Sequence, residues 1–184
     1  INYLSLDEFR KLNQQILKFS QEPEVLRQKI KGDYLMEHGK YVNAIKVYQK
    51  ALHDKLEGNV TEKDQLGGQF VGGIYHNMGC AYARLFQMEE AITCFSRAYE
   101  HLRTMASIKS YLYAVYMEKG IRAFAQKAAE LGVDSNSESE ILAEVEAAAK
   151  EMFESEDGKK YAKALEEKKK GNFDGYREAL ENML

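Results

Sequence analysis

The stretch YHNMGCAYARLFQMEEAITCFSRAY, residues 75–99, decides the fold. Its apolar side chains recur every three or four positions, which is typical of two amphipathic helices joined by a tight corner. Small residues stand where the two helices must touch, and aromatic rings accompany them. These positions are Gly79, Tyr82, Ala91, Phe95 and Ala98. The stretch therefore predicts a closely packed helical hairpin.

The composition of the whole chain extends this interpretation. The 184 residues are 45% hydrophobic and 30% charged, which suits one soluble globular domain. The chain has a single proline and almost no alternation of apolar and polar β-branched residues, so it shows no strand pattern. The sequence therefore predicts an all-α protein.

Helical periodicity and capping residues divide the rest of the chain. Ser5 with Glu8, and Ser137 with Glu140, have the spacing of capping boxes, and Gly132 suits a helix C-terminus. Residues 55–63 are polar and are expected to form a loop. The predicted helices cover residues 5–19, 23–38, 41–56, 62–86, 88–102, 106–119, 121–131, 137–153, 159–170 and 173–184.

Paired glycines interrupt the predicted 62–86 helix, where each internal glycine costs about 1 kcal/mol relative to alanine. The pairs are Gly67-Gly68 and Gly72-Gly73. Two explanations are open: a close approach of this backbone to a neighbouring helix, or a kink or break near Gly67.

The hairpin is repeated along the chain. At a constant offset of 47, Gly32, Gly39, Tyr41, Ala44, Tyr48 and Ala51 align with Gly79, Phe86, Met88, Ala91, Phe95 and Ala98. At an offset of 34, Tyr82, Ala91 and Phe95 align with Tyr116, Ala125 and Ala129. In the first two copies the small residue (Gly32 or Gly79) is expected to let two helices approach with an alanine (Ala44 or Ala91) opposite it, while the ring (Tyr48 or Phe95) fills the space between hairpins. One hairpin cannot bury its apolar face alone, so the copies are expected to stack.

On these residues, the segments 25–56 and 72–105 resemble two tetratricopeptide repeats, and 106–132 resembles a degenerate third. The chain is similar in outline to bacterial proteins of this repeat type. The resemblance implies a right-handed α-α superhelix of helical hairpins with capping helices at both ends. The implied divisions are a cap at 1–22, repeats at 23–57, 62–105 and 106–132, and C-terminal caps at 137–184.

The resemblance also implies a concave groove, lined by the first helix of each pair, that takes a peptide or a partner segment. By repeat position the lining residues are Lys29, Asp33, Met36, Glu37, His76, Asn77, Cys80, Ala83, Arg84, Ser107, Ser110, Ala114 and Met117. Lys29 and Arg84 are the strongest candidates, because an anchored cation can bind a carboxylate or a carbonyl.

One mode of binding known in this family is disfavoured by the sequence. Members that grip a free C-terminal carboxylate use a lysine, two asparagines, a second lysine and an arginine, and only Lys29 and Asn77 match. Asp33 stands in place of an asparagine, and Ser107 and Tyr111 stand in place of the basic pair. Asp33 would repel a carboxylate, so we predict that this chain does not bind such tails.

Catalytic and cofactor motifs are not found in the sequence. No histidine has a second histidine three or four residues away, and no phosphate-binding loop is present. Cys80 lies one helical turn from His76, but no third orienting group accompanies them. We therefore expect a non-enzymatic scaffold or adaptor with no cofactor, no metal, and no nucleic-acid or membrane partner.

Charge is unevenly distributed. Residues 1–132 carry a net charge of +3 and residues 133–184 a net charge of −6. The acidic C-terminal helices either form a solvated face or fold back over the basic body and occupy its groove. The run Lys168–Lys170 is interpreted as a solvated helix end.

Two other roles stay open at this point. The chain could be a peptide-sensing regulatory domain whose partner module lies upstream of Ile1, since the sequence does not begin with methionine. It could also be a self-assembling structural protein, for example a homodimer. Cys80 and Cys94 are expected to be free thiols in a reducing, cytoplasmic compartment.

Overall fold

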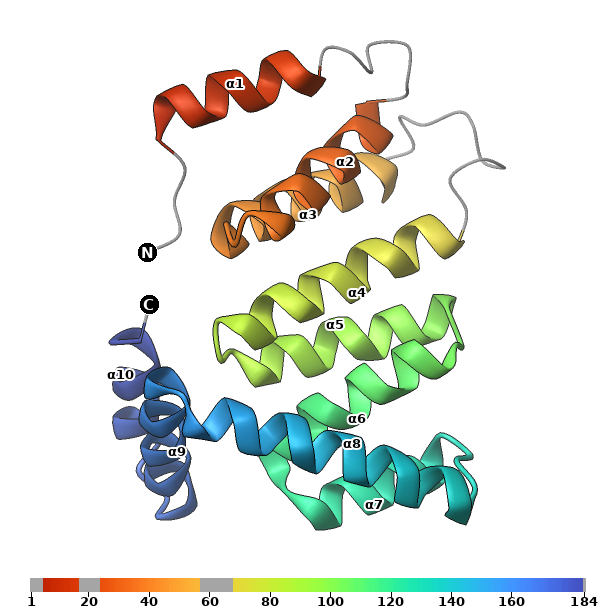
Figure 1. Cartoon of the computed structure of the whole chain (residues 1–184), viewed down its shortest axis with the longest axis vertical. Helices are drawn as coiled ribbons and strands as arrows, with labels where there is room; N and C mark the ends of the chain where they lie inside the picture. The colour runs from red at the N-terminus through yellow and green to blue at the C-terminus, as the bar shows by residue number, and fades with distance from the viewer. Residues whose placement is uncertain (1–4, 17–23, 57–67, 184) are drawn as a thin grey trace.

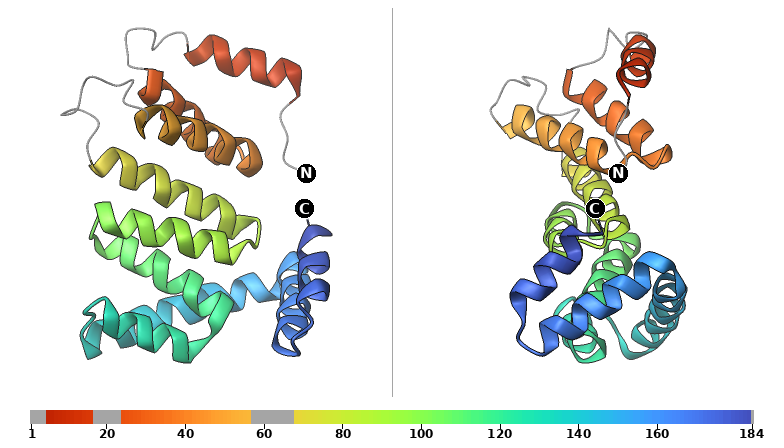
Figure 2. Two further views of the ribbon diagram at one scale, coloured as in Figure 1. Left: turned by 180° about the vertical axis from the view of Figure 1, so that it is seen from behind. Right: turned by 90° about the vertical axis from the view of Figure 1, so that its left-hand side faces the viewer.

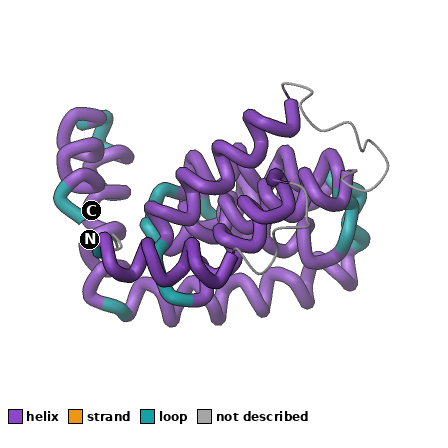
Figure 3. The backbone as a smooth tube through the Cα atoms, turned by 90° about the horizontal axis from the view of Figure 1, so that it is seen from above, coloured by secondary structure: helices purple, strands orange, loops and turns teal. Residues whose placement is uncertain are grey.

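The computed structural model describes residues 5–16, 24–56 and 68–183. Within these ranges the chain is helical, and no strand is present (Figure 3). The prediction of an all-α protein is thus confirmed. The helices are α1 (Leu6–Ile16), α2 (Glu24–Glu37), α3 (Tyr41–Leu56), α4 (Gly68–Arg84), α5 (Met88–His101), α6 (Met105–Lys119), α7 (Ile121–Glu130), α8 (Ser135–Glu154), α9 (Glu156–Lys169) and α10 (Phe173–Glu181).

Three helical hairpins, α2–α3, α4–α5 and α6–α7, stack one on another (Figure 1). The α1 helix lies over the α2–α3 end of this stack, and Leu12 is buried there. The α8 helix packs across α6, and α9 and α10 form a further hairpin beside one end of the stack (Figures 1 and 2).

Gly32 and Gly79 allow the close helix approach that the repeat pattern predicts, but each lies against the aromatic ring of its own hairpin, where the pattern placed an alanine opposite the glycine. A Cβ on Gly32 would collide with the Tyr48 ring, and a Cβ on Gly79 would lie 2.5 Å from Phe95 Cε1. Gly72 is also required, because its Cβ would lie 2.7 Å from Leu102 Cγ. The α4 helix is continuous from Gly68, so close approach explains Gly72, whereas the alternative of a break near Gly67 falls outside the described residues.

The hairpin corners repeat the same backbone geometry. Gly39 and Phe86, which the offset of 47 aligns, have positive φ angles of 69° and 58°. The amide of the next residue donates to an equivalent carbonyl in each case, Lys40 to Leu35 at 2.8 Å and Gln87 to Tyr82 at 2.9 Å. Each corner is therefore the same left-handed helix ending, with phenylalanine replacing glycine in the second copy.

The outer helix of the third hairpin departs from the predicted alignment. Ala125 and Ala129 are exposed, so they do not take the buried places of Ala91 and Phe95, and this part of the prediction is wrong. The buried residues of α7 are Phe124 and Ala128, one position earlier. The apolar stripe of α7, and not the repeat period, decides which of its faces packs.

Two predicted helix starts in the C-terminal part are wrong, whereas the predicted capping box at the first helix is confirmed. The Ser5–Glu8 capping box is present, with Glu8 N donating to Ser5 Oγ at 3.2 Å. The predicted box at Ser137 is not, because α8 begins at Ser135 and Asp134 accepts the Ser137 amide at 2.8 Å. Ser155 likewise caps α9, which begins at Glu156 and not at Lys159.

The α9–α10 hairpin is held by a buried carboxylate on α6. Glu118 accepts hydrogen bonds from the Tyr161 hydroxyl, from the Tyr176 hydroxyl at 2.9 Å, and from Lys168 Nζ. Lys168 also bonds Glu89 on α5 at 2.9 Å. Lys168 is therefore not part of a solvated helix end as the sequence suggested.

These contacts shift the pKa values of the groups that surround Glu118. Burial and the neighbouring carboxylate raise the pKa of Tyr161 and of Tyr176. Desolvation lowers the pKa of Lys168, but its hydrogen bonds to Glu118 and Glu89 outweigh this effect and raise it overall. At neutral pH Lys168 is therefore an ammonium group and the hydroxyls of Tyr161 and Tyr176 are neutral.

The glycine–ring contact predicts different effects on stability for two alanine substitutions in α4. Gly79→Ala should lower the free energy of unfolding by about 1–3 kcal/mol, because the new methyl group overpacks the Phe95 ring. Gly73→Ala is the matched control, since its Cβ would lie 3.7 Å from the nearest atom, Lys29 Cε. It should leave stability unchanged or raise it by up to about 1 kcal/mol. Urea unfolding followed by circular dichroism measures both, and equal effects would contradict the contact.

Removal of the buried carboxylate tests the attachment of the C-terminal hairpin. Glu118→Ala should lower the free energy of unfolding by about 1–3 kcal/mol, because the Tyr161 and Tyr176 hydroxyls lose their buried acceptor and Lys168 keeps only Glu89. Glu140→Ala, an exposed glutamate of α8, is the control and should change stability by less than about 0.5 kcal/mol. A loss below about 1 kcal/mol for Glu118→Ala in urea unfolding would show that the network is not needed.

Candidate functional site

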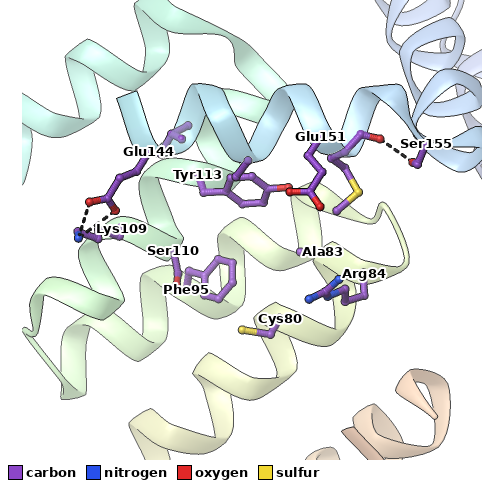
Figure 4. Close-up of a pocket in the computed structure, with 13 residues that line it drawn as sticks. Cys80, Ala83, Arg84, Phe95, Lys109, Ser110, Tyr113, Glu144, Glu151 and Ser155 are labelled. Atoms are coloured by element: carbon purple, nitrogen blue, oxygen red, sulfur yellow. Dashed lines mark hydrogen bonds and ion pairs between the residues drawn. The ribbon is translucent and has the colours of Figure 1, made fainter. Parts of the chain in front are cut away.

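A pocket of about 590 Å³ lies between the stack and the α8 helix (Figure 4). It gathers residues from α4, α5, α6 and α8. The lining residues are Cys80, Ala83, Arg84, Phe95, Lys109, Ser110, Tyr113, Glu144, Val145, Ala148, Glu151, Met152 and Ser155. Four residues of the predicted groove, Cys80, Ala83, Arg84 and Ser110, are brought together here.

The pocket has an apolar lining and two different polar ends. Apolar atoms come from Phe95 of α5 and from Val145 and Met152 of α8, among others. At one end Lys109 Nζ of α6 and Glu144 of α8 form an ion pair at 3.0 Å, which bridges the two walls. At the other end Arg84 of α4 and Glu151 of α8 line opposite walls (Figure 4).

The α8 wall is fixed by an apolar stripe with the spacing i, i+4, i+8. Ile141, Val145 and Ala149 are all buried. Ile141 and Val145 belong to the same buried cluster as Leu112, Phe124 and Ala128 of α6 and α7. This stripe orients the acidic side chains of α8 outward and toward the pocket. The C-terminal segment therefore presents a solvated acidic face and also contacts the basic body, which the sequence analysis had treated as alternatives.

The C-terminal helices also cover part of the predicted groove. Ala114 and Met117 of α6 are buried in one cluster with Ala149 of α8 and Tyr161 of α9. Ser107 is buried as well, because it forms a capping box with Thr104 at the start of α6. These three residues were expected to face a partner, and the structure assigns them to packing and capping.

The N-terminal part of the predicted groove is closed by its own hydrogen bonds. Lys29 Nζ contacts Asp33 at 2.7 Å, and Asn77 Nδ2 donates to the same carboxylate at 3.0 Å. The Tyr48 hydroxyl also donates to Asp33, and burial together with this bond raises the pKa of Tyr48. Lys29, Asp33 and Asn77 are thus brought together, but they bind one another. Glu37 is exposed at the end of α2 and does not line the pocket.

The pocket residue Cys80 and its neighbour His76 form a neutral pair. Cys80 Sγ lies 3.6 Å from His76 Nε2, and the His76 ring packs against Phe95 with a centroid distance of 5.6 Å. Burial raises the pKa of the Cys80 thiol, which the nearby Arg84 charge only partly opposes, and burial lowers the pKa of His76. The geometry therefore favours a thiol and a neutral imidazole over a thiolate–imidazolium pair.

The described residues offer neither a cluster of metal ligands nor a membrane-spanning helix. They contain no group of three or more histidine, cysteine, aspartate or glutamate side chains that could hold a metal ion. Among the same residues, no helix combines the length and the apolarity that crossing a membrane requires.

Comparison with known proteins gives no family for this chain. No family model, no curated protein and no solved structure among those compared matches it. The resemblance to tetratricopeptide repeats therefore rests on the residues of this chain alone.

The pocket contains residues that the sequence reasoning did not single out. Tyr113 was missed because it stands at the repeat position of Gly79, where a small residue is expected. Glu144 and Glu151 were missed because the repeat pattern does not extend to α8. The signal that was available is the buried stripe of α8, which shows that the helix packs but does not identify its partner.

The pKa of Cys80 predicts its reactivity. In a Cys94→Ser variant, the alkylation rate of Cys80 by iodoacetamide should keep rising above pH 9, because burial holds the thiol protonated beyond its ordinary pKa. The Cys80→Ser variant is the control, and its remaining thiol, Cys94, has a pKa raised to about 11 by burial. A rate for Cys80 that levels off near neutral pH would instead indicate an activated nucleophile.

Proposed function

We propose that this chain is a non-catalytic binding module of the tetratricopeptide type, which takes a peptide segment of a partner protein in the pocket between α4, α6 and α8. The repeated glycine–ring contacts and the equivalent corners at Gly39 and Phe86 support the repeat type. The observation that carries the binding role is the pocket itself, whose apolar lining is combined with a few polar groups (Figure 4).

The size and chemistry of the pocket suit a short peptide segment. A volume of about 590 Å³ lies within the range of ligand sites, about 300–1,000 Å³. Phe95, Val145 and Met152 offer apolar surface to side chains, whereas Arg84 and Glu151 offer a donor and an acceptor. Recognition of this kind orients a ligand through few polar contacts and gains affinity from apolar burial.

The N-terminal groove is a weaker candidate for the same role. Lys29 and Asn77 are the two residues that match the carboxylate-gripping set, and both already bond Asp33. A carboxylate ligand would have to displace Asp33 and would be repelled by it. This supports the prediction against binding of acidic C-terminal tails.

The α8 helix is better described as a wall of the site than as an inhibitor that leaves it. Its stripe of Ile141, Val145 and Ala149 is buried, so its removal would expose part of the core. A peptide-sensing regulatory role would use the same pocket, and it differs from the adaptor role only in what the bound peptide controls.

Two neighbouring alanines of α8 provide the test of the pocket. Ala148 and Ala147 are both exposed, but only Ala148 lines the pocket. Peptides selected by phage display against the full chain should lose at least about tenfold in affinity for Ala148→Trp, because the indole fills the site. Ala147→Trp should bind them as the native chain does, and fluorescence anisotropy with labelled peptides measures all three proteins. Equal affinity for the two variants would place peptide binding elsewhere.

A further inference from the structure

We propose that the pocket recognises the main chain of an uncharged peptide segment, with Arg84 donating to a carbonyl oxygen and Glu151 accepting an amide N–H. This inference rests on the proposed function and names the chemistry of its ligand. It begins from the different pairing of charges at the two ends of the pocket.

At one end of the pocket the α6 and α8 walls are close enough for the opposite charges of Lys109 and Glu144 to pair. They reach across from α6 to α8 and form an ion pair at 3.0 Å. Arg84 and Glu151 also stand on opposite walls, but no hydrogen bond or ion pair joins them to each other or to another group among the described residues (Figure 4). A cation and a carboxylate are thus left facing one open space.

Tyr113 lies beside Glu151 in the pocket, and the charges of Arg84 and Glu151 both act on its hydroxyl (Figure 4). Burial raises the pKa of its hydroxyl, the Arg84 charge opposes this shift, and the Glu151 charge adds to it. In the described part of the chain the Tyr113 hydroxyl has no hydrogen-bond partner, although it points along the pocket toward Glu151 (Figure 4). It can therefore donate to, or accept from, a bound group at the same place.

The charge balance of the site selects the class of ligand. The Lys109–Glu144 pair is neutral overall, so Arg84 and Glu151 determine the local field. An acidic group that Arg84 attracts would be repelled by Glu151, and a basic group that Glu151 attracts would be repelled by Arg84, because both charges line the same pocket (Figure 4). A peptide bond carries a donor and an acceptor without net charge, and it satisfies both walls at once.

The apolar lining complements main-chain recognition. In an extended peptide successive side chains point in opposite directions, so one set faces the protein while main-chain groups remain accessible at the edges. Phe95, Val145 and Met152 supply surface for an apolar side chain. The expected ligand is therefore an extended segment with apolar side chains and neutral neighbours.

The test uses three equimolar libraries of acetylated and amidated pentapeptides. All contain apolar and amide side chains, and they differ in a central residue that is glutamine, glutamate or lysine. Affinity selection by the full chain, read by mass spectrometry, should enrich peptides from the glutamine library over the other two. In the best binder, N-methylation of one main-chain amide should lower affinity by about tenfold, since Glu151 then loses its donor.

A double-mutant cycle separates main-chain recognition from general fit. The N-methylation penalty should disappear in Glu151→Ala and persist in Glu154→Ala, an exposed glutamate of α8 that does not line the pocket. Arg84→Ala should weaken the unmethylated peptide by about tenfold as well. These results together support the inference.

Other outcomes overturn the inference in distinguishable ways. Enrichment from the glutamate or lysine library alone, or a methylation penalty that persists in Glu151→Ala, would reject main-chain recognition while peptide binding in the pocket stands. If no library yields a binder that Ala148→Trp weakens, both this inference and the proposed function fail.

Discussion

The contact between a glycine and an aromatic ring sets the spacing on which the stack depends. The Phe95 ring lies against the bare backbone of Gly79, and Tyr48 lies in the same way against Gly32. Each ring takes the volume that a side chain on the facing helix would otherwise fill, so the two helices are held close and aligned. Phe95 also lines the pocket. The residue that closes the second hairpin therefore contributes to the candidate site, and packing and binding share one side chain.

The pocket arises from the way in which the stack is terminated. Three hairpins leave an apolar face open, and α8 covers it with Ile141, Val145 and Ala149. The covering helix is longer than its neighbours, and part of its length stands off from α4 and leaves the pocket between them. The α9–α10 hairpin then attaches through Glu118, whose buried charge is matched by Lys168 and two tyrosine hydroxyls. The helix that ends the stack therefore also forms one wall of the candidate site.

The sequence was informative where contacts are local and repeated. The offset of 47 between Gly32 and Gly79 identified the hairpins and their corners, because both helices of a hairpin lie within one repeat. It was misleading in α7, where Ala125 and Ala129 match the pattern but Phe124 and Ala128 supply the larger buried face. The sequence did not predict pairs of residues that are far apart in the chain. Lys168 was interpreted as solvated because its partners Glu89 and Glu118 lie 79 and 50 residues away. Of the predicted groove, Cys80, Ala83, Arg84 and Ser110 reach the pocket. Lys29 and Asn77 do not, because both bind Asp33.

The corner at Phe86 limits how far the hairpins are interchangeable. A non-glycine residue in the left-handed region costs about 1–3 kcal/mol, and here the ring offsets this cost by packing on Tyr161 of α9 with a centroid distance of 5.4 Å. Gly39 and Gly120, at the other two corners, have no such requirement. The second hairpin is consequently adapted to a helix that lies about seventy residues further along the chain. Transplanted into an array of identical repeats, it would keep the strained corner and lose the ring's partner, so the modularity of this fold ends at its central repeat.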